Sequence, residues 1–349
     1  MFSSQPAQIV ALIRSGKMVN IGGRPVIVPN SNSHRRSSQS GGSIKLALAF
    51  AAIYLVWGST YLAIRYAVET IPPLVAAGIR HTIAGGILLA WACARGFRPK
   101  REHWGAGFIV GALFFLVGHG TLHWAEQRVA SGLAALLIAT EPMFILVLAW
   151  ASGQQKISRL SALGLAFGVI GVAILTGVSA KNTSPLGMIA VLVGSLSWAA
   201  GVVISPKLKL PTDALARTAV PLVCGAAMLL AAAGVTGEFQ SLHWSAVSVR
   251  SILGLAYLIV FGSIVAFTAY TWLLQRCPPT LVATHTYANP IVAVLLGWLL
   301  ASEPLTARVA VASVAILGAI VLIRRGERGA ARRDVVPASR NVKSFEQCA

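Results

Sequence analysis

The chain has 349 residues, of which 56% are hydrophobic and only 11% are charged, and its formal net charge is +19. A soluble domain carries roughly a quarter charged residues, so this composition excludes an ordinary soluble protein and predicts a polytopic membrane protein. The positive charge does not predict nucleic-acid binding, because Lys and Arg lie between or beyond the apolar segments and form no basic module with interleaved aromatic residues.

Two polar tails flank the apolar part of the chain. Residues 1–43 are rich in Ser, Gly, Asn and Pro and cannot bury enough apolar surface to fold alone, so we expect a disordered N-terminal tail. Residues 325–349 form a polar and basic C-terminal tail.

Ten apolar segments lie between the tails, and each is about long enough to cross a hydrocarbon core of ~30 Å. The breaks between them carry Pro, Gly or charged residues. The sequence therefore predicts an all-α protein with ten transmembrane helices. Their approximate limits are 45–66, 73–95, 104–124, 129–151, 160–178, 186–206, 213–236, 250–274, 280–301 and 306–324.

The Lys and Arg residues separate when the loops are assigned alternately to the two faces of the membrane. One face holds both tails, the loops at 95–101, 156–159 and 207–209, and Arg276. The other face holds little beyond Arg65, Arg128, Lys181, Arg250 and Arg308. By the positive-inside rule, both termini are expected to be cytoplasmic in a multi-pass protein of the plasma (inner) membrane.

The two halves of the chain match each other at a fixed offset. A shift of 148 residues places Trp124 on Trp272, Pro142 on Pro290 and Trp150 on Trp298, and a shift of 141 places Trp57 on Trp198. Tryptophans and prolines rarely coincide in this way, so the pattern indicates a duplication, with repeats at 44–178 and 186–324. Each repeat holds five spans, an odd number, so the second copy enters the bilayer upside down. Inverted repeats are the architecture of many secondary transporters.

A single carboxylate interrupts the fourth segment. Glu141 lies about twelve residues into it, ~18 Å from the membrane face at 1.5 Å per residue. A charge at this depth costs at least ~2.5 to 3.5 kcal/mol, so Glu141 should face the bundle interior. It is the candidate proton carrier, and the alternative is a permanently neutral, hydrogen-bonded Glu. Pro142 and Pro290 predict helix kinks in both repeats, with Asn289 in place of the carboxylate in the second.

Three stretches suggest a family. They are VWGSTYLAIRYAVETIPPLVAAGIRH at 56–81, the TEP and NP kinks, and LLASEPLTARVAVASVAILGAIVLI at 299–323. In these, the chain resembles the EamA-type members of the drug/metabolite transporter (DMT) superfamily, in particular the YedA-like branch, over about 45–324. The resemblance implies an exporter of amino acids, other metabolites or toxic compounds in exchange for protons. The first repeat has GQQ at 153–155 where the second keeps SEP at 302–304, so that loop carboxylate is not expected to be essential in both halves.

Polar and aromatic residues at membrane depth are the candidate substrate-binding residues. They suit a cavity wall, although small polar residues also allow close helix packing. Arg80 either binds a substrate carboxylate or pairs with Glu141, or else it locks the bundle by donating to backbone carbonyls. The candidates are Trp57, Ser59, Thr60, Tyr61, Arg80, Ser195, Trp198, His285, Tyr287 and Asn289.

A histidine pair in the third segment resembles a metal-binding helix face. His119 and His123 lie four residues apart, and Glu126 follows. We expect Glu126 in a loop, and no acidic ligand lies at mid-membrane depth on the same face, so we predict neither a metal site nor a cofactor.

The sequence predicts a secondary transporter that exports a small amino acid-like or drug-like metabolite by proton-coupled alternating access. Its expected partners are this substrate, protons and the lipid bilayer, and the oligomeric state stays open, a homodimer included. A channel or a lipid-translocating protein of the same fold is the alternative. We do not expect an enzyme, because the chain has no HExxH, no GxSxG and no intramembrane Asp.

Overall fold

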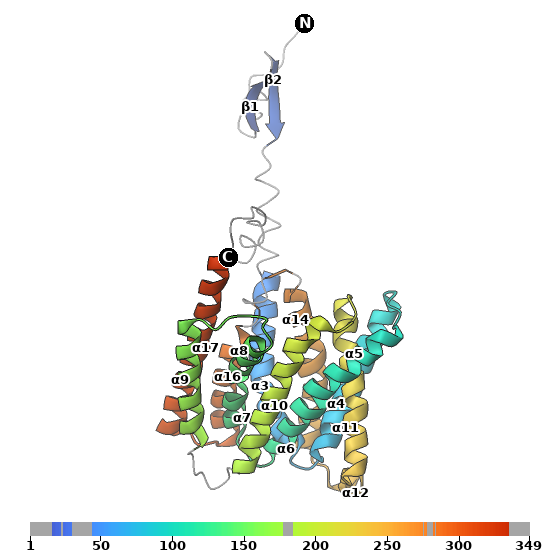
Figure 1. The fold of residues 1–349 in the computed structure, drawn as a ribbon. Helices are drawn as coiled ribbons and strands as arrows, with labels where there is room; N and C mark the ends of the chain where they lie inside the picture. The colour runs from blue at the N-terminus through green and yellow to red at the C-terminus, as the bar shows by residue number, and fades with distance from the viewer. Residues whose placement is uncertain are drawn as a thin grey trace, which may run out of the picture. The chain divides into compact units, whose positions relative to one another are not determined.

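The computed structural model describes residues 16–21, 24–29, 44–176, 184–274, 276–277, 282 and 284–334, and its helices form the bundle drawn in Figure 1. The chain divides into two units, of which one holds residues 1–48 and the other begins at Ala49.

The first unit contains a short hairpin. Strands β1 (Gly16–Ile21) and β2 (Arg24–Pro29) pair antiparallel, with Ile21 opposite Arg24. The sequence between them is Gly22-Gly23, a dipeptide that favours a two-residue hairpin connection. This hairpin was not among the predicted elements. The other residues of 1–43, and residues 335–349 of the second predicted tail, lie outside the described residues.

The ten apolar segments are helical, in the predicted order and close to the predicted limits. Eight are long and apolar enough to cross a membrane, and two, Arg159–Leu175 and His285–Ala301, are shorter. The last helix runs well beyond its predicted end, to Asp334. The helices are 44–67 with α3 (Trp57–Ala67), α4 (Pro73–Ala94), α5 (Arg101–Gly111) with α6 (Gly120–Glu126), α7 (Ser131–Ile138) with α8 (Glu141–Ala151), α9 (Arg159–Thr176), α10 (Pro185–Ile204), α11 (Ala214–Val235), α13 (Val249–Tyr257) with α14 (Ala266–Leu274), α16 (His285–Ala301) and α17 (Ala307–Asp334). The short helix α12 (Glu238–Ser241) lies between α11 and α13.

Three spans contain wider, π-helical turns. These are Ala52–Val56 before α3, Ala112–His119 between α5 and α6, and Leu258–Val265 between α13 and α14. The last two lie in the third and eighth spans, which are equivalent in the two repeats. A π-helical turn shifts the helix register and leaves backbone carbonyls available to other partners, and such turns occur frequently at functional sites.

The fourth span is broken rather than kinked. Helix α7 ends at Ile138 and α8 begins at Glu141, so Ala139 and Thr140 lie between them. Pro142 therefore lies in the first turn of α8, where a missing N–H costs little. In the second repeat, Pro290 lies inside the single helix α16.

The helix contacts follow the repeat. Helix α4 packs against α11 and α9 packs against α17, and each pair joins equivalent spans of the two copies. The contact of α3 with α16 likewise has its counterpart in the contact of α10 with α8. The fold is thus two inverted five-helix repeats that meet along a shared interface.

Glycines allow the closest approach in this interface. A Cβ atom on Gly111 of α5 would lie 2.8 Å from the backbone nitrogen of Gly225 and 2.8 Å from the carbonyl oxygen of Pro221, both on α11. Backbone atoms cannot move aside as a flexible side chain can, so this crossing requires glycine.

We expect the substitution Gly111→Ala to destabilise the bundle by about 1–3 kcal/mol, the usual cost of overpacking a well-packed interior. Thermal unfolding of the detergent-purified protein should show a lowered midpoint. Gly105→Ala on the same helix is the matched control, because nothing lies within 4 Å of the added Cβ. Equal midpoints for the two variants would contradict this account of the crossing.

Candidate functional site

A cluster of aromatic and polar side chains surrounds Trp57 at the start of α3. The Trp57 ring lies 4.9 Å from the His285 ring and 5.1 Å from the Tyr270 ring, between centroids. Its indole nitrogen donates to the carbonyl oxygen of Gly262 at 3.1 Å. This carbonyl belongs to the π-helical turn Leu258–Val265, which therefore supplies a polar partner in the middle of the eighth span.

Arg80 lies beside the same π-helical turn. It is 3% exposed, and its Nε donates to the hydroxyl of Ser263 at 3.0 Å, while its Nη1 has no hydrogen-bond partner among the described residues. A Cβ on Gly262 would lie 2.9 Å from Cγ2 of Thr60 and 3.4 Å from Nη2 of Arg80, so glycine allows α3 to approach the turn closely. The ion pairs found among the described residues do not join Arg80 to Glu141.

Three histidines extend from Arg80 on α4 to the third span. The Nε2 of His81, next to Arg80 on α4, lies 2.8 Å from Nδ1 of His119. The ring of His119 stacks on Trp198 of α10, with centroids 5.2 Å apart, and its carbonyl oxygen is 2.7 Å from Nδ1 of His123. His81 and His123 are fully buried. No group of three or more potential ligands that could hold a metal ion is present in the described residues.

Glu141 lies at the break between α7 and α8, partly buried, in the first turn of α8. The positive charge that acts on it is that of Arg324 on α17, which is also within electrostatic range of His285 and Tyr270. Arg324 itself forms a loose ion pair with Glu327, 3.9 Å between Nη1 and Oε2. The aromatic cluster and the carboxylate thus share one electrostatic environment.

The other predicted candidates divide between this cluster and local packing. The hydroxyl of Ser59 bonds with that of Tyr257 at 2.7 Å, whereas Thr60 donates to the carbonyl oxygen of Trp57. The amide nitrogen of Asn289, in the orientation that satisfies both acceptors, donates to the carbonyls of His285 and Tyr54. Ser195 contacts Thr140 at 3.5 Å between hydroxyls.

Two further predicted candidates, Tyr287 and Tyr61, have contacts with other parts of the bundle. Tyr287 reaches the carbonyl oxygen of Ile320 on α17, at 3.4 Å, and packs against the apolar core. Tyr61 is within electrostatic range of Glu141 and also of Glu126.

Carboxylates close one end of the bundle, where α3 ends and α4 begins. Glu303, 9% exposed, accepts hydrogen bonds from the backbone nitrogen of Ser131 at 2.7 Å, from its hydroxyl at 2.8 Å and from the backbone nitrogen of Gly132 at 3.0 Å. Nη1 of Arg65 lies 3.5 Å from Oε1 of Glu303. We call Glu303, Arg65, Ser131 and Gly132 the Glu303 network. It caps the N-terminus of α7 with a residue from the other repeat.

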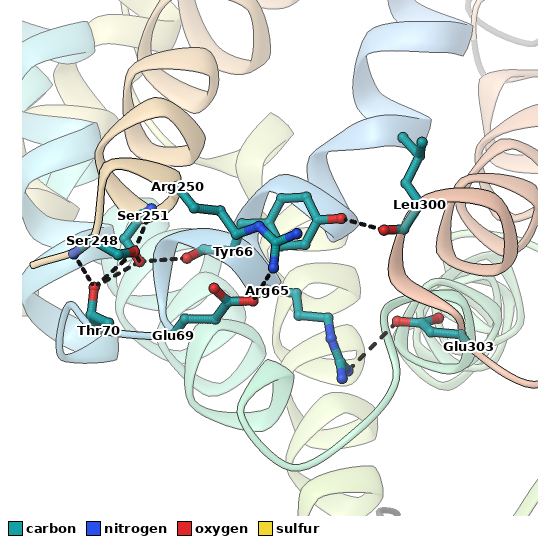
Figure 2. Close-up of polar contacts among 9 residues, drawn as sticks. All are labelled: Arg65, Tyr66, Glu69, Thr70, Ser248, Arg250, Ser251, Leu300 and Glu303. Carbon is teal, nitrogen blue, oxygen red and sulfur yellow. Dashed lines mark hydrogen bonds and ion pairs between the residues drawn. The ribbon is translucent and has the colours of Figure 1, made fainter.

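A second set of contacts at this end also joins the two repeats, as Figure 2 shows. Arg250 pairs with Glu69 at 3.5 Å and lies 4.4 Å above the ring of Tyr66. Tyr66 donates to the carbonyl oxygen of Leu300 at 3.0 Å, and its own carbonyl accepts from Ser251 at 2.7 Å. The end of α3 is thereby held to α13 and α16, and the structure is closed here.

Glu238 caps a further helix at this end. It accepts from the backbone nitrogens of Leu74 and Val75, at 2.8 and 3.1 Å, and so satisfies the first turn of α4. Burial raises the pKa of Glu238, and these two hydrogen bonds oppose the rise because they stabilise the ionised form.

Sequence reasoning did not assign roles to three groups that the structure makes prominent. Glu126, expected in a loop, is the last residue of α6 and is 1% exposed. Arg324, placed at the limit of the last span, lies within electrostatic range of Glu141. Glu303 was noted only as part of the SEP stretch. A carboxylate in a loop gives no sign in the sequence of its hydrogen-bond partner Ser131, 172 residues away.

The fold defines a class: an all-α membrane protein built from two inverted five-helix repeats. The EamA-like transporter family matches residues 44–177 and again 185–325, so the chain belongs to the EamA-like transporter family. The resemblance noted in the sequence is confirmed.

Curated relatives agree with this assignment. The chain is 37% identical over 282 residues to the "Uncharacterized inner membrane transporter YedA" of Escherichia coli strain K12, covering 80% of this chain and 90% of that protein. It is 27% identical over 284 residues to "Protein PecM" of Dickeya dadantii strain 3937, covering 81% and 93%. A crystal structure shares the fold, with a TM-score of 0.57 at 21% identity, and covers 85% of this chain and 99% of the other. The protein is thus a multi-pass membrane transporter of this family.

Glu303→Ala should destabilise the protein by at least about 2 kcal/mol, because two buried backbone N–H groups at the start of α7 lose their acceptor. Glu69→Ala removes an exposed carboxylate at the same end of the bundle and should cost no more than about 1 kcal/mol. Thermal unfolding of both variants in one detergent checks the difference. A midpoint for Glu303→Ala as high as that of Glu69→Ala would show that the cap does not hold α7.

Proposed function

We propose that the protein exports a small metabolite by proton-coupled alternating access. The observation that carries this proposal is the position of Glu141, an acidic group at a helix break in the middle of the fourth span, within electrostatic range of Tyr61 of the first repeat and Tyr270 of the second. Intramembrane carboxylates commonly belong to substrate or proton pathways. Inverted repeats support alternating access, because one copy can adopt the arrangement that the other leaves.

The orientation proposed for the bundle follows from its loop charges. Lys and Arg concentrate at the end that holds 95–101, 156–159, 207–209 and Arg276, together with both tails. This end is therefore cytoplasmic by the positive-inside rule, and we call it the inner end. The end closed by the Glu303 network faces outward, and we call it the outer end. The protein is then placed in the inner membrane, with both termini in the cytoplasm.

The side chains around Trp57 and Arg80 favour an amino acid-like or drug-like substrate. Trp57, Tyr270 and His285 offer aromatic faces, and Arg80 offers a guanidinium with an unpartnered Nη1. A planar fork of N–H donors suits a carboxylate, and aromatic faces suit an apolar or cationic portion of the same molecule. Trp57 of the first span and Arg80 of the second bond to neighbouring residues of the eighth span, Gly262 and Ser263.

Glu141 is suited to exchange a proton for substrate. In its ionised form, it is attracted by Arg324, and in its protonated form this attraction is lost. Glu141 begins helix α8 and Arg324 lies on α17. The attraction between these two helices is therefore present when Glu141 is ionised and absent when it is protonated. An alternative is a channel of the same fold, which would show no counterflow of labelled substrate against unlabelled substrate.

The first experiment identifies a substrate. Overexpression of the protein should permit growth at concentrations of one amino acid or drug that inhibit cells without it. That compound is then loaded into proteoliposomes, and its efflux is measured with and without a proton gradient. An efflux rate that does not depend on the proton gradient would contradict proton coupling but not transport itself.

Glu141→Gln should abolish the acceleration of efflux by a proton gradient, because the amide cannot take up or release a proton. Substrate exchange without a gradient should persist, since the variant keeps the size and polarity of the side chain. Glu102→Gln is the matched control, because Glu102 is an exposed carboxylate paired with Lys209 at the inner end. Gradient-driven efflux at the wild-type rate in Glu141→Gln would remove Glu141 from the mechanism.

Arg80→Ala should weaken binding of carboxylate-bearing substrates by about 1.5–3 kcal/mol, the range of hydrogen bonds to charged groups. Amides or esters of the same compounds should lose much less. Arg80→Lys tests whether charge alone is enough, because it keeps the positive charge without the fork of donors. Competition of each compound with labelled substrate gives the affinities, and an equal loss for carboxylate and amide would assign Arg80 to structure.

A further inference from the structure

We propose that Glu126 is a second proton-binding residue, which controls opening of the outer end through the Glu303 network. This rests on the proposed function, because control of one end of the bundle has a role only in a transporter that opens its two ends alternately. It assigns to Glu126 a role separate from that of Glu141.

The first observation is the burial of Glu126. The residue ends α6 and is 1% exposed, and neither of its carboxylate oxygens has a hydrogen-bond partner among the described residues. An ionised carboxylate without a partner is costly to bury, and such a group holds a proton instead. The closed structure therefore accommodates Glu126 as a neutral acid.

The second observation is the neighbourhood of Glu126. Arg65 and Glu303 both act on it through their charges, and Arg65 also reaches the carbonyl oxygen of Val129, three residues further along the chain. Two residues after Val129, Ser131 begins α7 and donates its backbone N–H to Glu303. One arginine thus acts on both carboxyl groups, and in the closed structure it pairs with Glu303.

The remaining groups around Glu126 do not neutralise its charge. Helix α3 contributes Tyr61 and Arg65 to its surroundings, and the connection between α16 and α17 contributes Glu303. Its own span contributes His119 and His123, and α4 contributes Arg80, whose charge acts on His123, and His81, on which the charge of His123 acts. Helices α7 and α10, which also contact α6, carry no charged or titratable side chain.

The linkage between the proton and the opening follows from these contacts. Opening the outer end brings external water to Glu126, where it releases its proton to that water. The resulting carboxylate repels Glu303 and competes for Arg65, so the Glu303 network cannot form again until a proton returns. Closure therefore takes up one proton from the outside, and a rise in external pH favours the open state.

The sequence of events suits an exporter. Substrate leaves through the open outer end, and a proton from the outside then binds Glu126 and allows the network to close. The ionised Glu126 in this way keeps the outer end open until a proton from the outside has bound it again.

The test measures how fast a buried reporter becomes accessible from outside. Ser195→Cys places a thiol in α10 at a fully buried position, and right-side-out spheroplasts are treated with a membrane-impermeant maleimide from about pH 5 to about pH 8, across the usual range of perturbed carboxyl groups. The chain without the reporter gives the background of its native cysteines. After correction for the reactivity of an exposed thiol, the labelling rate should rise about fivefold or more with pH.

Three variants in the reporter background decide the assignment. Glu126→Gln, which resembles the neutral acid in shape, should label slowly at every pH, and Glu303→Gln should label faster than the parent at low pH because its cap is weakened. Glu69→Gln, an exposed carboxylate at the same end, should keep the pH dependence of the parent. Elution of each purified variant as a monodisperse peak shows that it is folded.

A pH-dependent rise in Glu126→Gln equal to that of the parent would overturn the proposal, and so would a parent whose labelling does not respond to pH. The assay needs no substrate and no transport. Glu141→Gln should therefore retain the response even if it abolishes coupled efflux, and a failure of the Glu141 proposal leaves this test intact.

Discussion

A polar group inside the hydrocarbon layer has no water to bind, so its partner must come from the protein. The structure meets this constraint by pairing groups from one repeat with groups from the other. The carbonyl of Gly262 accepts from Trp57, Ser263 accepts from Arg80, and Glu303 accepts from the first amides of α7. Each of these bonds crosses between repeats. The polar groups that specify the interface are therefore the same groups that must separate if the repeats move.

The two repeats share their shape but differ in charge at equivalent positions. Glu141 corresponds to Asn289, and the Glu303 of SEP corresponds to the Gln pair of GQQ. The amide donors offer a reason for the second difference. Glu303 caps the backbone nitrogens of Ser131 and Gly132, whereas the 148-residue offset places Pro279 opposite Ser131. Proline has no N–H to donate, so residue 279 lacks the backbone donor that Ser131 offers to Glu303.

Hydropathy was sufficient to predict the spans and the internal offset to predict the repeats, because both are features that a sequence displays directly, and the family was predicted from the resemblance of three stretches. Trp57 and His285 were each named in advance as polar or aromatic groups at membrane depth, whereas the contact between them was not predicted. The partners of Glu303 and the burial of Glu126 could not be predicted, because they depend on contacts across more than a hundred residues. The π-helical turns were missed as well, since their apolar composition resembles that of ordinary helix.

Tyr61 connects the two proposed proton sites. It belongs to α3, one residue after Thr60 and four before Arg65, and it is within electrostatic range of both Glu141 and Glu126. A residue of α3 therefore interacts electrostatically with Glu141 at mid-membrane depth and with Glu126 near the outer end. A movement of α3 would therefore alter the surroundings of both carboxyl groups.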